Sequence, residues 1–385
     1  MKITTHIRSR IMKKAILSLA LLFAITLNLP TAEGCTRFTY EGASSFVLTG
    51  RNWDWDRGIN HDLWVLPAGL KRSGQAGRTA ADPFHGPNDL QWVSRYGSTV
   101  VTVGGGIGDG MNEKGLSGSF TLDSFAEYAK PLPGRKDVNL FFTLQYVLDN
   151  FATVAEAIKG LNSINVTAMP IKLPNGSGFN LMLTLTDATG DNAVFQWEKG
   201  EMKIYHGKQY NVTANEASVP TLNYGGMLAV RDYYRGINIL TKGTPVFLPG
   251  TYSSEDRIAR VGYYLDQAPK ASDIDEAREW TFRIARSVAT AMPFAEPNVA
   301  HVYDITGWSA VADLKTRRYY VDVPRLLGSY YVDLTKLDLR PGTPLRKLVV
   351  ATSNGQGKPA TMAPHSGDVT QKLKVGKPDA TWDIK

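Results

Sequence analysis

Hydrophobic and polar residues alternate along much of the chain between residues 36 and 122. Because successive side chains of a β-strand point to opposite faces, this period of two predicts strands, and the many β-branched and aromatic residues strengthen the prediction. The stretch 71–89 is rich in Gly, Pro, Arg and Asp, which indicates a surface loop. The strands are expected at 36–42, 44–55, 61–70, 92–105 and, after a turn, in 109–122.

Near residue 138 the period changes to that of an amphipathic helix. Residues 138–151 carry apolar side chains at helical spacing. Thr153 followed by Glu156 forms a capping-box signature, which predicts a second helix over 154–161. Further helices are expected at 253–266 and 274–292.

Strand patterns return in the second half of the chain. Residues 178–207 contain three of them, with the turn sequence DATGDN between the first two. Runs of strands that alternate with pairs of helices indicate an α+β fold with largely antiparallel sheets covered by helices. One domain is therefore expected over 35–352, followed by a loosely ordered tail at 353–385. The remaining strands are expected in 301–323 and 329–339.

The first 34 residues have the pattern of a secretory signal peptide. A basic region precedes a short apolar stretch, and the small residues Ala32 and Gly34 stand where a cut before Cys35 requires them. The apolar stretch is short for a membrane span and no later run reaches about 18 apolar residues, so no stable membrane insertion is expected. The pattern predicts export, to the periplasm or out of the cell. Translation starts at Met1 or Met12 in this interpretation.

Composition places the chain among soluble globular proteins. Of its 385 residues, 43% are hydrophobic and 21% are charged, which is enough apolar material for a large core. The formal net charge of +7 falls to +3 once the five basic residues and one acid of the leader are removed. No basic block interleaved with aromatic residues follows, and we therefore expect no nucleic-acid partner.

Cys35 is the only cysteine of the chain and stands at the predicted cleavage point. A single cysteine cannot form an intramolecular disulfide, which leaves a reactive thiol, an intermolecular bridge, a lipid anchor or an inert buried residue. Glu33 disfavours the anchor, because lipoprotein processing sites have a small or apolar residue at that place. A lipid-anchored binding protein acylated at Cys35 remains the alternative from another functional class.

A catalytic interpretation uses the amino group that cleavage would expose. As the first residue, Cys35 carries a thiol with an ordinary pKa of about 8.5 and an α-amine with one of about 7.7–8.0. The amine can take the thiol proton near neutral pH, so nucleophile and base arrive on one residue. None of the histidines after the leader lies in a motif that connects it to Cys35.

Five segments, taken together and in order, resemble the choloylglycine hydrolase and penicillin V acylase family. The resemblance implies a four-layer αββα sandwich of the N-terminal nucleophile hydrolases, which cleaves linear amide C–N bonds of small acyl-amide substrates without a metal or cofactor. It also implies a homotetramer. The matching segments are CTRF at 35–38, TGRNWDW at 49–55, DGMNEKGL at 109–116, FLPGTYSSEDRIARVGYY at 247–264 and WSAVADLKTRRYYV at 308–321.

Within the family the leader and the short LSGSFTL region are similar to the exported Gram-negative branch. That branch leans toward penicillin V and N-acyl homoserine lactones. The resemblance therefore ranks an acylase of that kind first and a conjugated bile salt hydrolase second.

The resemblance assigns three charged residues to the nucleophile. Arg51 and Asp54 match the family's pair in the GRNWD strand, and Arg257 matches the arginine that follows LPG. A guanidinium beside Cys35 favours the thiolate, and a carboxylate can hold the α-ammonium. Arg257 is expected to organise the nucleophile or a substrate carboxylate, although Thr251 replaces the family's aspartate.

The same carry-over predicts an oxyanion site and an acyl pocket. Asn215 is expected to donate its side-chain amide, with Asn211 as a competitor, and the backbone N–H of Leu122 to be the second donor. Trp55 or Trp53 is expected to line the acyl pocket, and alternation favours Trp55, on the face opposite Asp54. The alternative for either tryptophan is a purely structural role in the hydrophobic core.

Asn112 and Glu113 belong to the most conspicuous motif, yet their pattern indicates a structural role. MNEKGL is typical of a tight turn in which Gly115 meets a backbone requirement.

Overall fold

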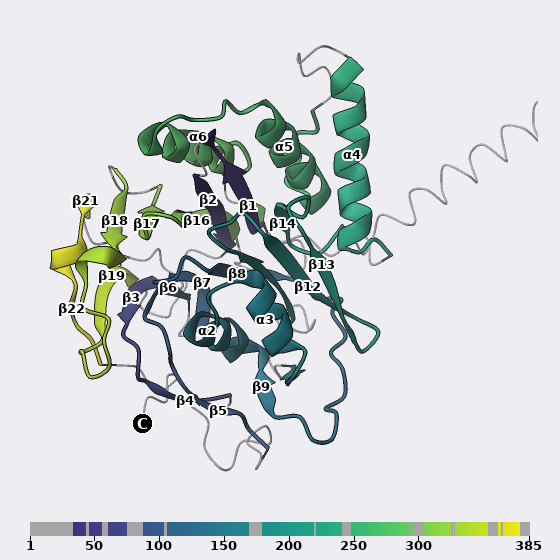
Figure 1. Ribbon diagram of the computed structural model, residues 1–385. Helices are drawn as coiled ribbons and strands as arrows, with labels where there is room; N and C mark the ends of the chain where they lie inside the picture. Colours follow the sequence, from purple (N-terminus) through teal and green to yellow (C-terminus); the bar gives the residue numbers. More distant parts are fainter. Residues whose placement is uncertain are drawn as a thin grey trace, which may run out of the picture. The chain divides into compact units, whose positions relative to one another are not determined.

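The structure of the protein is a computed structural model (Figure 1). The predicted leader up to Glu33 and most of the predicted loop 71–89 lie outside the described residues. The described residues belong to one compact unit, 32–385. They are 34–43, 46–55, 61–74, 88–103, 106–168, 179–218, 221–240, 248–292, 294–295, 303–324, 326, 328–352, 361–362 and 365–377.

The first sheet is built around the strand that follows Cys35. Its order is β14-β1-β2-β16-β17-β18-β21, with β15 paired to β16, and every pairing is antiparallel except that of β18 with β21. The strands are β1 (Thr36–Glu41), β2 (Val47–Trp55), β14 (Val212–Ala214), β15 (Phe294–Ala295), β16 (Tyr303–Asp313), β17 (Arg318–Asp322), β18 (Tyr330–Asp333) and β21 (Gly367–Asp368).

The second sheet is antiparallel throughout. Its order is β13-β12-β11-β8-β7-β6-β3-β19-β20, with β22 paired to β19. The strands are β3 (His61–Leu66), β6 (Ser98–Val103), β7 (Gly106–Asn112), β8 (Ser117–Leu122), β11 (Leu181–Thr186), β12 (Asn192–Glu198), β13 (Glu201–His206), β19 (Arg346–Thr352), β20 (Thr361–Met362) and β22 (Lys374–Val375). Two small ribbons pair β4 (Lys71–Ser73) with β5 (Gln91–Val93) and β9 (Asp137–Asn139) with β10 (Asn165–Thr167).

Helices cover the outer face of each sheet, which makes a four-layer αββα sandwich (Figure 1). The predicted fold class is confirmed. N-cap side chains begin three helices where the sequence signals them: Thr153, Ser253 and Asp273 each accept from the amide three residues on. The helices are α2 (Leu140–Asn150), α3 (Val154–Leu161), α4 (Tyr224–Leu240), α5 (Ser254–Gln267) and α6 (Ile274–Ser287), with short 3-10 turns η3 (Leu334–Lys336) and η4 (Thr370–Lys372).

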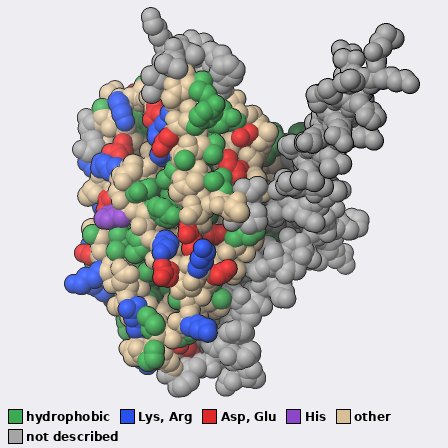
Figure 2. All heavy atoms as spheres, turned by 90° about the vertical axis from the view of Figure 1, so that its right-hand side faces the viewer, with side chains coloured by type: hydrophobic (Ala, Val, Ile, Leu, Met, Phe, Trp, Pro, Cys, Tyr) green, Lys and Arg blue, Asp and Glu red, His purple; other side chains and the backbone are tan. Residues whose placement is uncertain are grey.

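Three hydrophobic layers fill the spaces of the sandwich. One lies between α2, α3 and the second sheet and includes Leu144 and Phe120. One lies between the two sheets and includes Cys35 and Met111. The third packs α4, α5 and α6 onto the first sheet. Basic and acidic side chains are interspersed with apolar ones on the face drawn in Figure 2. Among the described residues, no helix is both long and apolar enough to span a bilayer.

Three features differ from the sequence predictions. Helix α4 was not anticipated, because Gly225, Gly226 and Gly236 weaken its pattern and each lowers helix propensity. The predicted strand 92–105 is two strands, β5 and β6. In the segment expected to be a loose tail, β21 and β22 pair with the two sheets and Val369 is buried, contacts that its polar composition did not indicate.

The MNEKGL turn has the structural role that its sequence indicates. Gly115 has φ +83°, and a Cβ there would stand 2.2 Å from the Leu314 carbonyl. The side-chain oxygen of Asn112 accepts from two amides of the turn, and its Nδ2 donates to the carbonyls of Leu148 and Phe151 at 2.9 and 2.7 Å. Asn112 therefore joins the turn to the end of α2.

We expect Asn112→Ala to lower the free energy of unfolding by about 3 kcal/mol, because it leaves two buried carbonyls without donors. Lys114→Ala, an exposed change in the same turn, should alter it by less than about 0.5 kcal/mol. Urea denaturation measures both. Equal stability of the two variants would contradict a structural role for Asn112.

Candidate active site

Cys35 directly precedes β1 and is 4% exposed. Strand β1 lies between β14 and β2, with Thr36 paired to Ala214 on one side and to Asn52 on the other. Continuing these registers by one residue places Asn215 and Trp53 beside Cys35. With residues 1–34 attached, the Cys35 nitrogen is part of its peptide bond with Gly34.

A guanidinium lies against the thiol. Arg51 Nη2 donates to Cys35 Sγ at 3.4 Å, and the Arg51 guanidinium also lies over the Trp53 ring, 5.4 Å from its centre. Burial raises the thiol pKa, and the charge of Arg51 lowers it by less. With residues 1–34 attached, burial thus outweighs the charge of Arg51.

Asp54 faces the nitrogen side of Cys35. Its Oδ1 accepts from the Thr306 hydroxyl, whereas its buried Oδ2 has no hydrogen-bond partner among the described residues. A Cβ on Gly34 would lie 2.8 Å from this Oδ2, so the carboxylate borders the space next to the Cys35 nitrogen. Burial raises the Asp54 pKa to about 6, opposed by the charges of Arg257 and Arg51 and by the Thr306 bond.

Arg257 holds the backbone around Cys35 from the first turn of α5 and is fully buried. Its Nη1 donates to the carbonyls of Gly34 and Cys35 at 2.7 and 2.5 Å and to Thr36 Oγ1 at 2.6 Å. Its other nitrogens donate to Tyr252 O and Ser254 Oγ. With so many bonds, the guanidinium is a fixed anchor for the residue that carries the thiol.

Asn215 and Leu122 lie against each other. The Leu122 N–H donates to Asn215 Oδ1 at 3.1 Å, while Asn215 Nδ2 is buried and has no acceptor among the described residues. The structure therefore brings the two predicted oxyanion donors together, but the Leu122 amide is engaged by the side chain of its partner. Asn211 lies against Thr39, well along β1 from Cys35, and is not part of this group.

An aromatic group adjoins the thiol on the face of β2 that Arg51 shares. Trp53 stacks on Trp308 with 6.0 Å between ring centres and is 9% exposed, as a core residue would be. Trp55 is less buried and meets Phe179 edge-on at 6.1 Å. Of the two tryptophans, Trp55 is thus the one open to a ligand, on the face opposite Asp54.

Sequence reasoning missed a buried charge cluster behind Arg51. Arg37 Nη1 lies 3.5 Å from Asp109 Oδ2 and donates to Ser119 Oγ at 2.7 Å, and the Tyr319 hydroxyl donates to Asp109 Oδ1 at 2.5 Å. Burial lowers the Arg37 pKa to about 10, and Arg51 adds to that effect. Arg37 and Asp109 both lie inside conspicuous motifs, but only the contact between the two sheets reveals that they pair.

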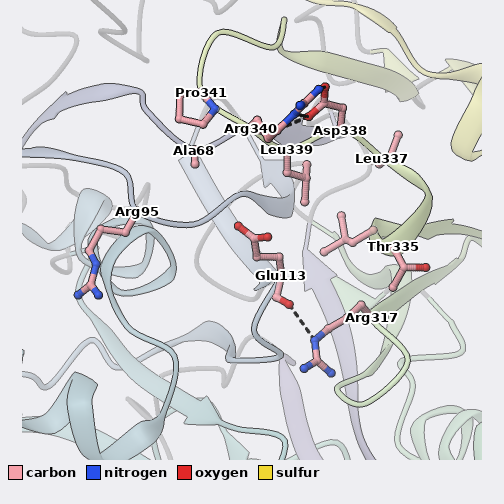
Figure 3. A pocket seen from close by; sticks show the side chains of 11 residues that line it. Ala68, Arg95, Glu113, Arg317, Thr335, Leu337, Asp338, Leu339, Arg340 and Pro341 are labelled. Carbon is pink, nitrogen blue, oxygen red and sulfur yellow. Dashed lines mark hydrogen bonds and ion pairs between the residues drawn. The ribbon is translucent and has the colours of Figure 1, made fainter.

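A pocket of about 570 Å³ lies away from these residues (Figure 3). Glu113 of the MNEKGL turn, at the end of β8 opposite Leu122, is among its lining residues. Its charged groups bond to the protein itself: Glu113 accepts from the Gly97 amide, Arg317 donates to the Glu113 carbonyl, and Arg340 pairs with Asp338. Among the described residues, no cluster of His, Cys, Asp or Glu is arranged to hold a metal ion.

Comparison with known proteins gives a consistent result. A family model described as linear amide C–N hydrolases, choloylglycine hydrolase family, matches residues 35–343. A penicillin V acylase of Pectobacterium atrosepticum is 30% identical over 83% of this chain and 86% of its own. A bile salt hydrolase/transferase of Clostridium perfringens is 25% identical over 79% of this chain and 94% of its own.

Solved structures agree on the fold. The structure of penicillin V acylase from Agrobacterium tumefaciens superposes with a TM-score of 0.74 at 31% identity, covering 89% of this chain and 98% of that one. A mutant of conjugated bile acid hydrolase from Clostridium perfringens has a TM-score of 0.68 at 20% identity, covering 83% and 98%.

Replacing Arg51 by Gln should raise the pKa of the Cys35 thiol further, because the opposing positive charge is lost. At pH 7.5 the rate of alkylation by iodoacetamide is expected to fall about tenfold. Since Cys35 is the only thiol, the pH dependence of this rate reads its ionisation directly. Arg95→Gln, which removes an arginine far from the thiol, is the control. An unchanged profile for Arg51→Gln would show that this guanidinium does not act on the sulfur.

Proposed function

Because the chain belongs to the choloylglycine hydrolase family of linear amide C–N hydrolases, it is an amide hydrolase, and we propose that Cys35 is its nucleophile after residues 1–34 are removed. The observation that carries the proposal is the convergence of Arg51, Asp54 and Arg257 on this single residue. One cation faces the sulfur, one carboxylate faces the nitrogen, and one guanidinium binds the carbonyl.

Removal of Gly34 turns the Cys35 nitrogen into an α-amine beside the unpaired Asp54 Oδ2. A carboxylate with a free buried oxygen suits an ammonium group, and Arg257 keeps its bond to the Cys35 carbonyl. Burial raises the Asp54 pKa to about 6 while Gly34 is attached, and the ammonium that processing creates lowers it again, because an opposite charge favours the carboxylate.

The reaction follows from these positions. Cys35 Sγ attacks the substrate carbonyl while its proton passes to the α-amine, and the carbonyl oxygen becomes an oxyanion. Asn215 Nδ2, buried and without an acceptor, is the donor ready to receive that oxyanion. The Leu122 N–H holds the Asn215 side chain in this orientation and joins as second donor only if it leaves Asn215 Oδ1. Each such donor contributes about 2.7–4 kcal/mol to transition-state stabilisation.

Collapse of the tetrahedral intermediate breaks the C–N bond, and the α-ammonium protonates the leaving amine. The acyl group then remains on Cys35 as a thioester. Water, deprotonated by the α-amine, attacks the thioester and releases the acid and the free thiol. All bonds made and broken in this cycle belong to the substrate, water and the first residue, while Asn215 stabilises the oxyanion.

The acyl group is proposed to lie against Trp55. This tryptophan packs against the hydrophobic layer that contains Cys35, and with Phe179 it forms a partly exposed aromatic surface that fits a flat aryl group such as phenoxyacetyl. The similarity to the penicillin V acylases points the same way and supports penicillin V as substrate. An N-acyl homoserine lactone is proposed beside it only on the family resemblance of the sequence. Conjugated bile salts are the second candidate, supported by the weaker similarity to the bile salt hydrolase/transferase.

Export is part of the proposal, since the leader pattern of residues 1–34 ends at the residue that must become the N-terminus. The periplasm of a Gram-negative bacterium is the proposed location, and a homotetramer the proposed assembly. The rival in which Cys35 bears a lipid predicts a different mass. A purified chain that begins at unmodified Cys35 supports the enzyme, and a lipid increment supports the anchor.

Cys35→Ala should fold and assemble like the wild type but lose amide hydrolysis by about 10³-fold or more, because no other thiol can form the thioester. Release of phenoxyacetic acid from penicillin V is the first measurement, followed by a conjugated bile salt and an acyl-homoserine lactone. Turnover by the variant that equals the wild type would remove Cys35 from the mechanism.

A chain that retains Gly34 should be inactive although every catalytic side chain is present. Its Cys35 nitrogen is an amide, which is no base near neutral pH, and the extra residue occupies the space beside Asp54. Intact mass must verify both N-termini, and the chain that starts at Cys35 is the matched control. Equal turnover by the two chains would place the base elsewhere and end the N-terminal nucleophile proposal.

A further inference from the structure

Two buried carboxyl groups directly follow the proposed oxyanion residues. Asp123 comes after Leu122 and Glu216 after Asn215, and they are 1% and 3% exposed. Asp123 Oδ1 and Glu216 Oε2 are buried and have no hydrogen-bond partner among the described residues. Neither carboxyl forms an ion pair with an arginine or lysine in the part of the chain that the structure describes.

The backbone ties the segments of these acids together. The Glu216 amide donates to the Leu122 carbonyl at 2.8 Å, next to the bond from the Leu122 amide to Asn215 Oδ1. Ser124 adds hydrogen bonds to the Glu216 carboxyl. Any force between the two carboxyls therefore acts on the geometry of Leu122 and Asn215.

The groups around the pair are neutral or acidic. Gln196 Nε2 donates to Asp123 Oδ2 at 2.9 Å, and Gln196 Oε1 is already taken by the Tyr224 amide. The other titratable groups that face Asp123 are Glu198, at the end of β12, and Tyr128. Nothing among these neighbours offsets two negative charges.

Two such carboxyls cannot both ionise easily at neutral pH. Burial raises the Asp123 pKa to about 6, and burial together with the charge of Asp123 raises that of Glu216 to about 7. In a folded chain the pair consequently keeps a proton up to about pH 7, whereas a free glutamate loses it near 4.3.

We propose that Asp123 and Glu216 hold one proton between them and, through it, position the oxyanion donors Leu122 and Asn215, so that its loss sets the alkaline limit of activity. This inference rests on the proposed amide hydrolysis. Both acids are positioning residues, since neither touches the reacting atoms.

Loss of the proton has two effects, and both lower the rate of the reaction. The carboxylates repel each other, which pushes residues 122–124 away from 215–216. The second negative charge also lies beside the place where the substrate oxygen becomes negative, and it opposes formation of the oxyanion. Both effects lower kcat as the pH rises and leave KM largely unchanged.

The test compares kcat between pH 5.5 and 9 for the wild type, Glu216→Gln and Glu201→Gln. Glutamine keeps the size of Glu216 and a hydrogen-bond donor but cannot ionise. Glu201 is an exposed acid on β13 and serves as control. At pH 8.5 the wild type and the control should retain about a tenth of their maximal kcat, whereas Glu216→Gln should retain more than half.

The proposal is overturned if kcat of the wild type does not fall at alkaline pH, or if it falls equally in Glu216→Gln. If Glu216→Gln does not fold, Asp123→Asn carries the same comparison.

Infrared spectroscopy gives a readout that needs no turnover. The wild type at pH 6 should show a band of a protonated carboxyl group that Glu216→Gln lacks, and this band should disappear near pH 7. Absence of that band overturns the shared proton. Calcium that the wild type retains after dialysis and Glu216→Gln does not retain would also overturn it, because the two carboxyls would then bind a metal ion instead of a proton. If the band is present but the protein has no amidase activity, the proposed function is wrong and the shared proton is not.

Discussion

Everything at the site depends on the register of β1 between β14 and β2. Because Thr36 pairs with Ala214 and with Asn52, the residue before it must lie beside Asn215. Because side chains alternate along β2, its two charged residues lie on opposite faces of the sheet. Arg51 points between the sheets toward the sulfur, and Asp54, three residues on, points to the helical side where the nitrogen lies. A slip of one residue between β1 and β2 would turn Arg51 and Asp54 to the opposite faces, and a slip between β1 and β14 would move Asn215 away from Cys35.

The charges that this register collects are costly to bury. Arg37, Arg51, Asp54, Asp109 and Arg257 are all almost fully inaccessible. A buried charge without a partner destabilises a fold by several kcal/mol, so most of these groups are bound to one another or to backbone carbonyls. Two of the buried atoms left unpaired are informative for that reason. Asp54 Oδ2 and Asn215 Nδ2 face the positions where the proposed reaction creates an ammonium and an oxyanion.

Local signals in the sequence predicted local structure well. Thr153, Ser253 and the MNEKGL turn each carry the cap or glycine that their geometry requires, and the structure confirms those elements. Contacts between distant segments left no such signal. The pairing of Arg37 with Asp109 and the bond from the Leu122 amide to Asn215 arise only when the sheets close. The family resemblance supplied the site residues, since the register of β1 against a strand near residue 214 cannot be read from periodicity.

The electrostatic design of the site resolves an apparent conflict in its protonation. A buried thiol resists ionisation, and an amine beside Asp54 resists deprotonation. In the proposed mechanism, however, the thiol and the α-amine of Cys35 share one mobile proton, and the thiolate with ammonium contains as many protons as the thiol with amine. Arg51 stabilises the thiolate and Asp54 the ammonium, so both favour the charged form of the same pair. The proton needed by the leaving amine is then on nitrogen once sulfur has attacked, and burial acts on the pair less than on a lone thiolate, because its net charge is zero.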